Sequence, residues 1–160
     1  MYCSFFALAV RNRFSFHTPC HHTRASSVLQ KNSKLYGPMN VFDYKNKSNC
    51  WNSEGSSDGN KECFFVVDFG RKVKVVELRI QFQAGFSAEL MTVLKQKSID
   101  KRFEVIDEHE VDDEHDLQTF VLEESDDVSA LKLVFEEFTD FYGRVTIYQL
   151  QAWGSEVSDV

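Results

Sequence analysis

The sequence predicts an all-β protein built as a single antiparallel β-sandwich. From Glu62 onward, short apolar runs are separated by polar turns and show no sustained 3.6-residue period, which is the pattern of strands. The chain has 160 residues, a length that suits one hydrophobic core. Its composition is 42% apolar and includes fifteen Phe but only seven Gly and two Pro, which favours a densely packed globule over a disordered chain.

The first two long strands are expected on either side of Gly70. The apolar run Cys63–Phe69 ends at this glycine. Residues 76–83 then alternate apolar and polar side chains, which predicts a strand with one buried and one solvated face. We expect this buried face to share one core with Trp51, and it consists of Val76, Leu78, Ile80 and Phe82.

Five further strands are expected towards the C-terminus. In the last of them the apolar phase shifts between Ile147 and Tyr148, which requires either a bulge or burial on both faces. Four glycines fall at the expected strand boundaries, where close turns and positive φ are readily accommodated: Gly70, Gly85, Gly143 and Gly154. The expected strands are Leu90–Gln96, Phe103–Ile106, Leu117–Leu122, Ala130–Phe135 and Arg144–Trp153.

The charge of the chain disfavours two classes of partner. The formal net charge is −7 and the sequence pI is about 5.2, whereas nucleic-acid binders usually carry a basic patch. The same charge opposes anionic membranes, and no run approaches the roughly 20 apolar residues that cross a bilayer. Twelve of the 25 acids lie between Glu104 and Asp127, and we expect the run from Asp107 to Asp116 to form a solvated acidic loop.

The N-terminal residues differ in composition from the acidic remainder. Residues 1–34 contain no Asp or Glu but carry five Lys or Arg, and their apolar stretch precedes the arginines, which is the wrong order for a secretory signal. A mitochondrial transit peptide and a disordered or mis-started N-terminus both remain compatible with this composition. The four cysteines have no paired metal-ligand spacing, and none lies after Cys63, which favours a reducing compartment.

Several short motifs resemble a discoidin-type, or galactose-binding-like, domain with a jelly-roll β-sandwich. The motifs are RASSVL at 24–29, LYG at 35–37, VFD at 41–43, CWNS at 50–53, VDFG at 67–70, and GRV at 143–145 followed by IYQL at 147–150. The resemblance covers residues 24–155, so we expect residues 1–23 to be a disordered leader and 156–160 a short tail. It implies structural roles for Asp43, Trp51, Asp68, Gly70, Gly143, Arg144 and Trp153.

A second set of motifs is similar to the family of small proteins that associate with the orphan nuclear receptor testicular receptor 4. These motifs are CWNS at 50–53, IQFQ at 80–83, GFS at 85–87, LQTF at 117–120 and TDFYGRV at 139–145. This resemblance implies a protein-binding module in the nucleus or cytoplasm that represses transcriptional activation by the receptor. It implies no catalysis and no direct nucleic-acid reading.

The expected partner-binding residues lie in loops that share one end of the sandwich. If Phe103–Ile106 is a strand, successive crossings place the loops around Phe86, Asp107–Asp116 and Thr139–Tyr142 together. Aromatic side chains at loop tips supply concentrated apolar contact area, although Phe86 is equally suited to covering the core. The candidate partner-binding residues are Phe86, Thr139, Asp140, Phe141 and Tyr142.

The alternative function is binding of a carbohydrate or another small ligand, which relatives of this fold perform. We expect both Trp51 and Trp153 to pack in the core rather than to form a sugar platform. Asp43 matches the first calcium ligand of some relatives, but Gln149 stands where they have Glu, so one ligand charge is missing. No catalytic set, metal or cofactor is expected.

Overall fold

The computed structural model describes residues 22–55 and 61–157, and in them the chain is an antiparallel β-sandwich. This confirms the predicted fold class. Residues 1–21, which make up most of the expected leader, lie outside the described residues. The strands are β1 (Thr23–Ala25), β2 (Trp51–Asn52), β3 (Cys63–Phe82), β4 (Ala88–Gln96), β5 (Phe103–Glu110), β6 (Leu117–Phe138) and β7 (Thr146–Glu156).

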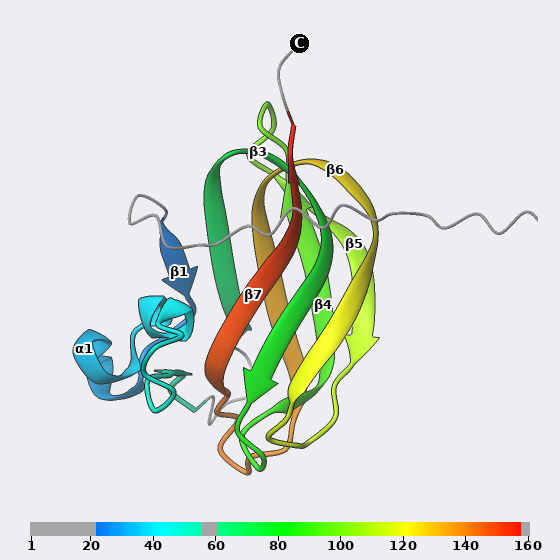
Figure 1. The fold of residues 1–160 in the computed structure, drawn as a ribbon. Coiled ribbons are helices and arrows are strands. Elements are labelled where there is room, and N and C mark those ends of the chain that lie inside the picture. The colour runs from blue at the N-terminus through cyan, green and yellow to red at the C-terminus, as the bar shows by residue number, and fades with distance from the viewer. Residues whose placement is uncertain (1–21, 56–60, 158–160) are drawn as a thin grey trace, which may run out of the picture.

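Short helical segments connect β1 to β2 on one side of the sandwich (Figure 1). They are the 3-10 segments η1 (Leu29–Lys31) and η2 (Pro38–Phe42) and the helix α1 (Ser33–Tyr36). Asn32 caps α1, since its side chain accepts a hydrogen bond from the Leu35 amide. Val41 and Phe42 in η2 are buried in the core, so this connection closes one side of the sandwich.

Two long strands, β3 and β6, pass through both layers of the sandwich. The first part of β3 pairs with β1 and with the second part of β6, whereas residues from Val73 onward pair with β7 and the first part of β6. Figure 1 shows both strands bending over the top of the molecule. The front layer therefore has the order β2-β7-β3-β6, and the rear layer has β1-β3-β6-β4-β5.

The bend in β3 corrects one prediction about its buried face. Leu78, Ile80 and Phe82 are buried as predicted, but Val76 is 42% exposed. The register with β7 shifts between Val75, which pairs with Gly154, and Glu77, which pairs with Trp153, so Val76 is an extra residue relative to β7. This irregularity lets Val75 point inward and turns Val76 outward, which a strict two-residue alternation could not anticipate.

The irregularity predicted in the last strand is present. Gln81 pairs with Gln149, and the next residue of β3, Phe82, pairs with Ile147. Tyr148 is therefore an extra residue in β7, as expected of a bulge. It allows Ile147 and Leu150 to be buried on the same face although they are three residues apart.

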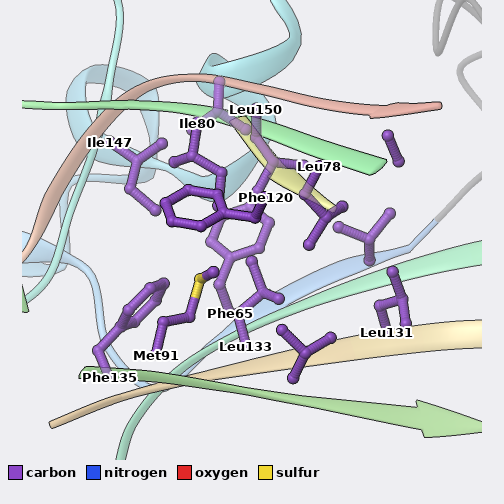
Figure 2. Packing of buried hydrophobic residues seen from close by; sticks show 14 of the residues in the cluster. Phe65, Leu78, Ile80, Met91, Phe120, Leu131, Leu133, Phe135, Ile147 and Leu150 are labelled. Carbon is purple, nitrogen blue, oxygen red and sulfur yellow. The ribbon is translucent and has the colours of Figure 1, made fainter. Parts of the chain in front are cut away.

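The core lies between the two layers and is rich in aromatic and branched side chains. Figure 2 shows Ile80, Ile147 and Leu150 from the front layer opposite Met91 and Phe135 from the rear layer. Trp51 belongs to this core, as predicted, and is 0% exposed. Its indole ring lies 5.2 Å from Phe65 and 6.2 Å from Phe135, and its Nε1 donates to the Ser27 carbonyl at 3.0 Å.

Trp153 does not enter the core, contrary to the prediction. Its neighbour Ala152 is buried, so Trp153 lies on the outer face of β7, where it is only half-buried. The Arg79 guanidinium lies 4.4 Å from the centroid of the Trp153 ring, and Nε1 donates to Gln151. This tryptophan therefore packs on the surface of the sheet through a cation–π contact.

Candidate partner-binding site at one end of the sandwich

Three loops meet at the lower end of the molecule in Figure 1, as the strand order predicted. They connect β3 to β4 (83–87), β5 to β6 (111–116) and β6 to β7 (139–145). The acidic segment is shorter than expected as a loop, because β5 continues to Glu110 and takes up residues 107–110. We refer to these three loops together as the loop end.

A polar cluster ties the three loops to one another. Asp113 Oδ1 accepts hydrogen bonds from the Gly85 amide at 2.7 Å and from the Ser87 hydroxyl at 2.9 Å. The Ser87 amide donates to Thr139 Oγ1 at 3.0 Å, and the Thr139 amide donates to the Ser87 carbonyl at 3.1 Å. Ser87 is fully buried, so its bonds are partly shielded from competing water, whereas the bond between Asp113 and the Gly85 amide is exposed.

An ion pair fixes the loop between β6 and β7. Arg144 Nε donates to Asp140 Oδ2 at 2.9 Å, Arg144 Nη2 donates to Oδ1 at 3.2 Å, and the Arg144 amide donates to Oδ2 at 3.1 Å. The hydrogen bonds from the Arg144 side chain hold the pKa of the Asp140 carboxyl below its usual value, with a further contribution from the Arg144 amide. Both charges therefore persist at neutral pH.

The aromatic side chains of the loop end surround this ion pair. The Arg144 guanidinium lies 4.9 Å from the centroid of the Phe86 ring and 5.5 Å from that of Tyr142. Phe141 packs edge to face on Tyr142 with a centroid separation of 5.3 Å. Phe141 is 94% exposed and Tyr142 is 60% exposed, so the tip of the loop presents two aromatic rings to solvent.

The five predicted partner-binding residues are brought together, but their environments differ. Phe86 is half-buried beneath Arg144 and is not part of the buried core cluster. Thr139 and Asp140 are engaged in hydrogen bonds within the loops, so their side chains hold the loop in shape. Only Phe141 and Tyr142 are strongly exposed.

Sequence reasoning missed two residues of this site, Asp113 and Ser87. Asp113 lies among acids at 112, 114 and 116, and nothing in the local pattern distinguishes it from them. Ser87 belongs to the GFS motif at 85–87, which does not by itself indicate what the side chain contacts. The signal is tertiary, because the partners of Asp113 at Gly85 and Ser87 are 28 and 26 residues away.

Asp43, which matches the first calcium ligand of some relatives, is engaged in local hydrogen bonds. The Asp43 carboxylate accepts from the Lys45 and Asn46 amides and from Asn49 Nδ2. In the part of the chain that the structure describes, no three or more His, Cys, Asp or Glu side chains are grouped as a metal site. No helix among the described residues is both long and apolar enough to span a membrane.

Curated relatives resemble the chain in sequence and solved structures resemble it in fold, whereas no protein-family model matches the chain. The chain is 37% identical over 139 residues to nuclear receptor 2C2-associated protein of Danio rerio, a match that covers 86% of this chain and 94% of the relative. The Homo sapiens protein of the same name is 34% identical over 135 residues, covering 84% of this chain and 92% of the relative.

Solved structures show the same fold at low sequence identity. The F5/8 type C domain of a Bacteroides fragilis protein superposes with a TM-score of 0.73 at 12% identity, covering 86% of this chain and 93% of that domain. A family 32 CBM from C. perfringens NanJ, solved in complex with galactose, gives a TM-score of 0.66 at 13% identity, with 83% and 93% covered. Both resemblances inferred from the sequence are thus confirmed. The chain belongs to the family of nuclear receptor 2C2-associated proteins and has the discoidin, or F5/8 type C, fold.

Proposed function

We propose that this protein is a non-enzymatic interaction module that associates with a nuclear receptor through its loop end. Membership of the nuclear receptor 2C2-associated family supports a receptor as the partner. The observation that carries the choice of surface is the pair of exposed rings, Phe141 and Tyr142, held above the Asp140–Arg144 ion pair. Exposed aromatic side chains on a fixed support are typical binding hot spots.

The loop end is built to hold these rings before a partner arrives. The Asp113, Ser87 and Thr139 hydrogen bonds connect the three loops, and Arg144 contacts both Phe86 and Tyr142. Preorganisation of this kind lowers the conformational entropy that binding removes. The acids of the 111–116 loop give the same end a negative potential, which favours a partner surface with basic residues around an apolar centre.

Association with this protein would lower transcriptional activation by the receptor. The association would take place in the nucleus or the cytoplasm. The family resemblance supports this repressor role. A reporter gene driven by a 2C2-type receptor tests it, since co-expression of the wild-type protein should reduce reporter output. Unchanged output, with binding intact, would limit the function to association alone.

The test of the surface is the double substitution Phe141→Ser and Tyr142→Ser. Both side chains are exposed, so we expect unchanged folding and at least about a tenfold weaker affinity for a purified 2C2-type receptor. The control is Ile99→Ser, which removes a 92% exposed apolar side chain from the turn between β4 and β5 at the opposite end. Equal affinity of the folded double variant and the control would contradict this choice of surface.

A second candidate function, binding of a carbohydrate or another small ligand, is favoured by one cavity near the loop end. Its volume is about 470 Å³, within the usual range of small-ligand sites, and it is lined by residues 61–63, 90 and 134–138. A glycan array with the wild-type protein tests this candidate. A saturable hit that is lost on substitution in the cavity, but not with Phe141→Ser, would support it.

A further inference from the structure

The outer face of the rear layer presents a groove that the loop-end proposal does not use. Because Phe135 and Met91 point into the core, their chain neighbours Glu136 and Leu90 point outward. The strand register places Leu90 of β4 directly between Glu136 of β6 and Glu110 of β5. The cavity of about 470 Å³ lies over this part of the sheet and includes Leu90 and Val134 in its lining.

The floor of this groove combines apolar and charged side chains. Val66 and Val134 also lie on this face, because their neighbours in β3 and β6 point into the core, and they are 3% and 9% exposed. Leu90 is half-buried, and Lys132 lies over the Phe64 ring at 4.6 Å while it pairs with Glu62 at 2.6 Å. The apolar part of the cavity lining consists of Leu90 and Val134 together with Cys63, Phe135 and Phe138.

The rim of the groove is acidic. Glu110, Glu136 and Glu137 are exposed, and Glu108 lies opposite Thr92 in the next row of the same face. None of these four carboxylates forms a salt bridge with a basic side chain within residues 22–55 and 61–157. Lys61 also lines the cavity, where Glu136 and Glu137 outnumber it, so the rim keeps a net negative charge and complements a cationic ligand.

We propose that this groove binds a basic segment of a protein partner, in which apolar side chains are flanked by Lys or Arg. The apolar side chains would lie on Leu90 and Val134, and the cations would face Glu110 and Glu136. A second copy of the chain is a poorer fit, because each copy carries a net charge of −7 and the rims would repel. The site is separate from Phe141 and Tyr142.

The test uses the full chain and a short synthetic peptide with Leu residues flanked by Lys, together with a matched peptide that has Glu in place of Lys. Affinity is measured by isothermal titration calorimetry, and the site is mapped by amide chemical shifts. We expect the Lys peptide to bind with shifts centred on residues 90, 110, 134 and 136. Shifts centred on the loop end, or equal binding of the Glu peptide, would overturn the proposal.

Paired variants separate a local site from general attraction. The double substitution Glu110→Gln and Glu136→Gln removes two exposed charges from the rim, and we expect about a tenfold weaker affinity for the Lys peptide. The control, Glu114→Gln with Asp116→Asn, removes two exposed charges from the 111–116 loop and should weaken it less than about twofold. Equal losses in both variants would show long-range attraction alone and would overturn the site.

Two further measurements separate this proposal from the alternatives. The variant Phe141→Ser with Tyr142→Ser should bind the Lys peptide as the wild type does, because the groove does not include these two residues. The groove can therefore be tested whether or not the loop end binds the receptor. Light scattering should show a monomer at the peptide-binding concentration. A dimer that the Glu110→Gln and Glu136→Gln variant abolishes would assign the groove to a second copy and contradict a partner segment.

Discussion

Trp51 and Trp153 lie in the same layer of the sandwich but on opposite faces of it. Trp51 is fully buried against Phe65 and Phe135, whereas Trp153 is half-buried on the outer face with Arg79 over its ring. Both are apolar residues in family-like motifs, so residue type alone predicted the same role for both. The difference follows from the side of the sheet on which each residue falls.

Replacement of Trp51 by Ala should lower the free energy of unfolding by about 3 to 5 kcal/mol, because it removes a large buried side chain and leaves a cavity. The Trp153→Ala change should cost less, since its ring is already partly in water. Urea denaturation followed by circular dichroism measures both. A loss below about 1 kcal/mol for Trp51→Ala, with partner binding impaired, would assign Trp51 to a ligand site.

The Asp140–Arg144 pair predicts a specific pH dependence. The pKa of Asp140 is lowered in the folded state by hydrogen bonds from Arg144, so the unfolded state binds more protons and the pair stabilises the fold above the unfolded value of about 3.9. This contribution is lost as the pH falls through the lowered pKa. We therefore expect Asp140→Asn to destabilise the protein at pH 7 and to have a shrinking effect below about pH 4.

Denaturation midpoints of the wild type and Asp140→Asn, measured across this pH range, test the pair. The matched control is Asp116→Asn, which removes an exposed acid from the neighbouring loop and should change stability little at any pH. A constant difference between the wild type and Asp140→Asn from pH 7 to pH 2 would contradict an ionised Asp140.

At the scale of the strand, the irregularity at Val76 decides which side chains are buried. Leu78→Ala should cost about 2 to 5 kcal/mol because Leu78 is 1% exposed, whereas Val76→Ala should change stability by less than about 0.5 kcal/mol. Chemical denaturation of both variants measures the contrast. Similar losses for the two would mean that Val76 is buried and that β3 alternates without interruption.

Asp113 is expected to act on the arrangement of loops rather than on the charge of the molecule. Its carboxylate holds Gly85 and Ser87, so Asp113→Asn should weaken these bonds and accelerate dissociation of the receptor. Exchange of the Gly85 amide with deuterium should become faster in the same variant. An unchanged exchange rate would show that the loop keeps its shape without this carboxylate.

At the scale of the whole molecule, the net charge of −7 is expected to increase the rate of association with a basic partner. The variant Asp112→Asn, Glu114→Gln, Asp116→Asn neutralises exposed acids of the 111–116 loop and leaves Asp113 in place. We expect a slower association rate with the receptor and a weaker dependence on salt, with little change in dissociation. Surface plasmon resonance at two ionic strengths measures this, and a change confined to dissociation would contradict steering.

The sequence by itself determined the fold class, the family and the location of most strand segments, because these depend on local patterns. It did not predict β1 or β2, and it divided β3 and β6 into two strands each, since their continuity depends on pairing with distant strands. Alternating apolar residues predicted Leu78, Ile80 and Phe82 as core, and the phase shift after Ile147 predicted the bulge at Tyr148. Each of these features is recorded within a few consecutive residues.

Only the tertiary structure decided which residues complete the two candidate sites. Asp113 differs from its acidic neighbours because Gly85 and Ser87 approach it from a distant strand connection. Glu110, Leu90 and Glu136 form one row because β4 pairs with two strands at once. Such groupings depend on strand order and register, which long-range pairing sets and no local pattern contains.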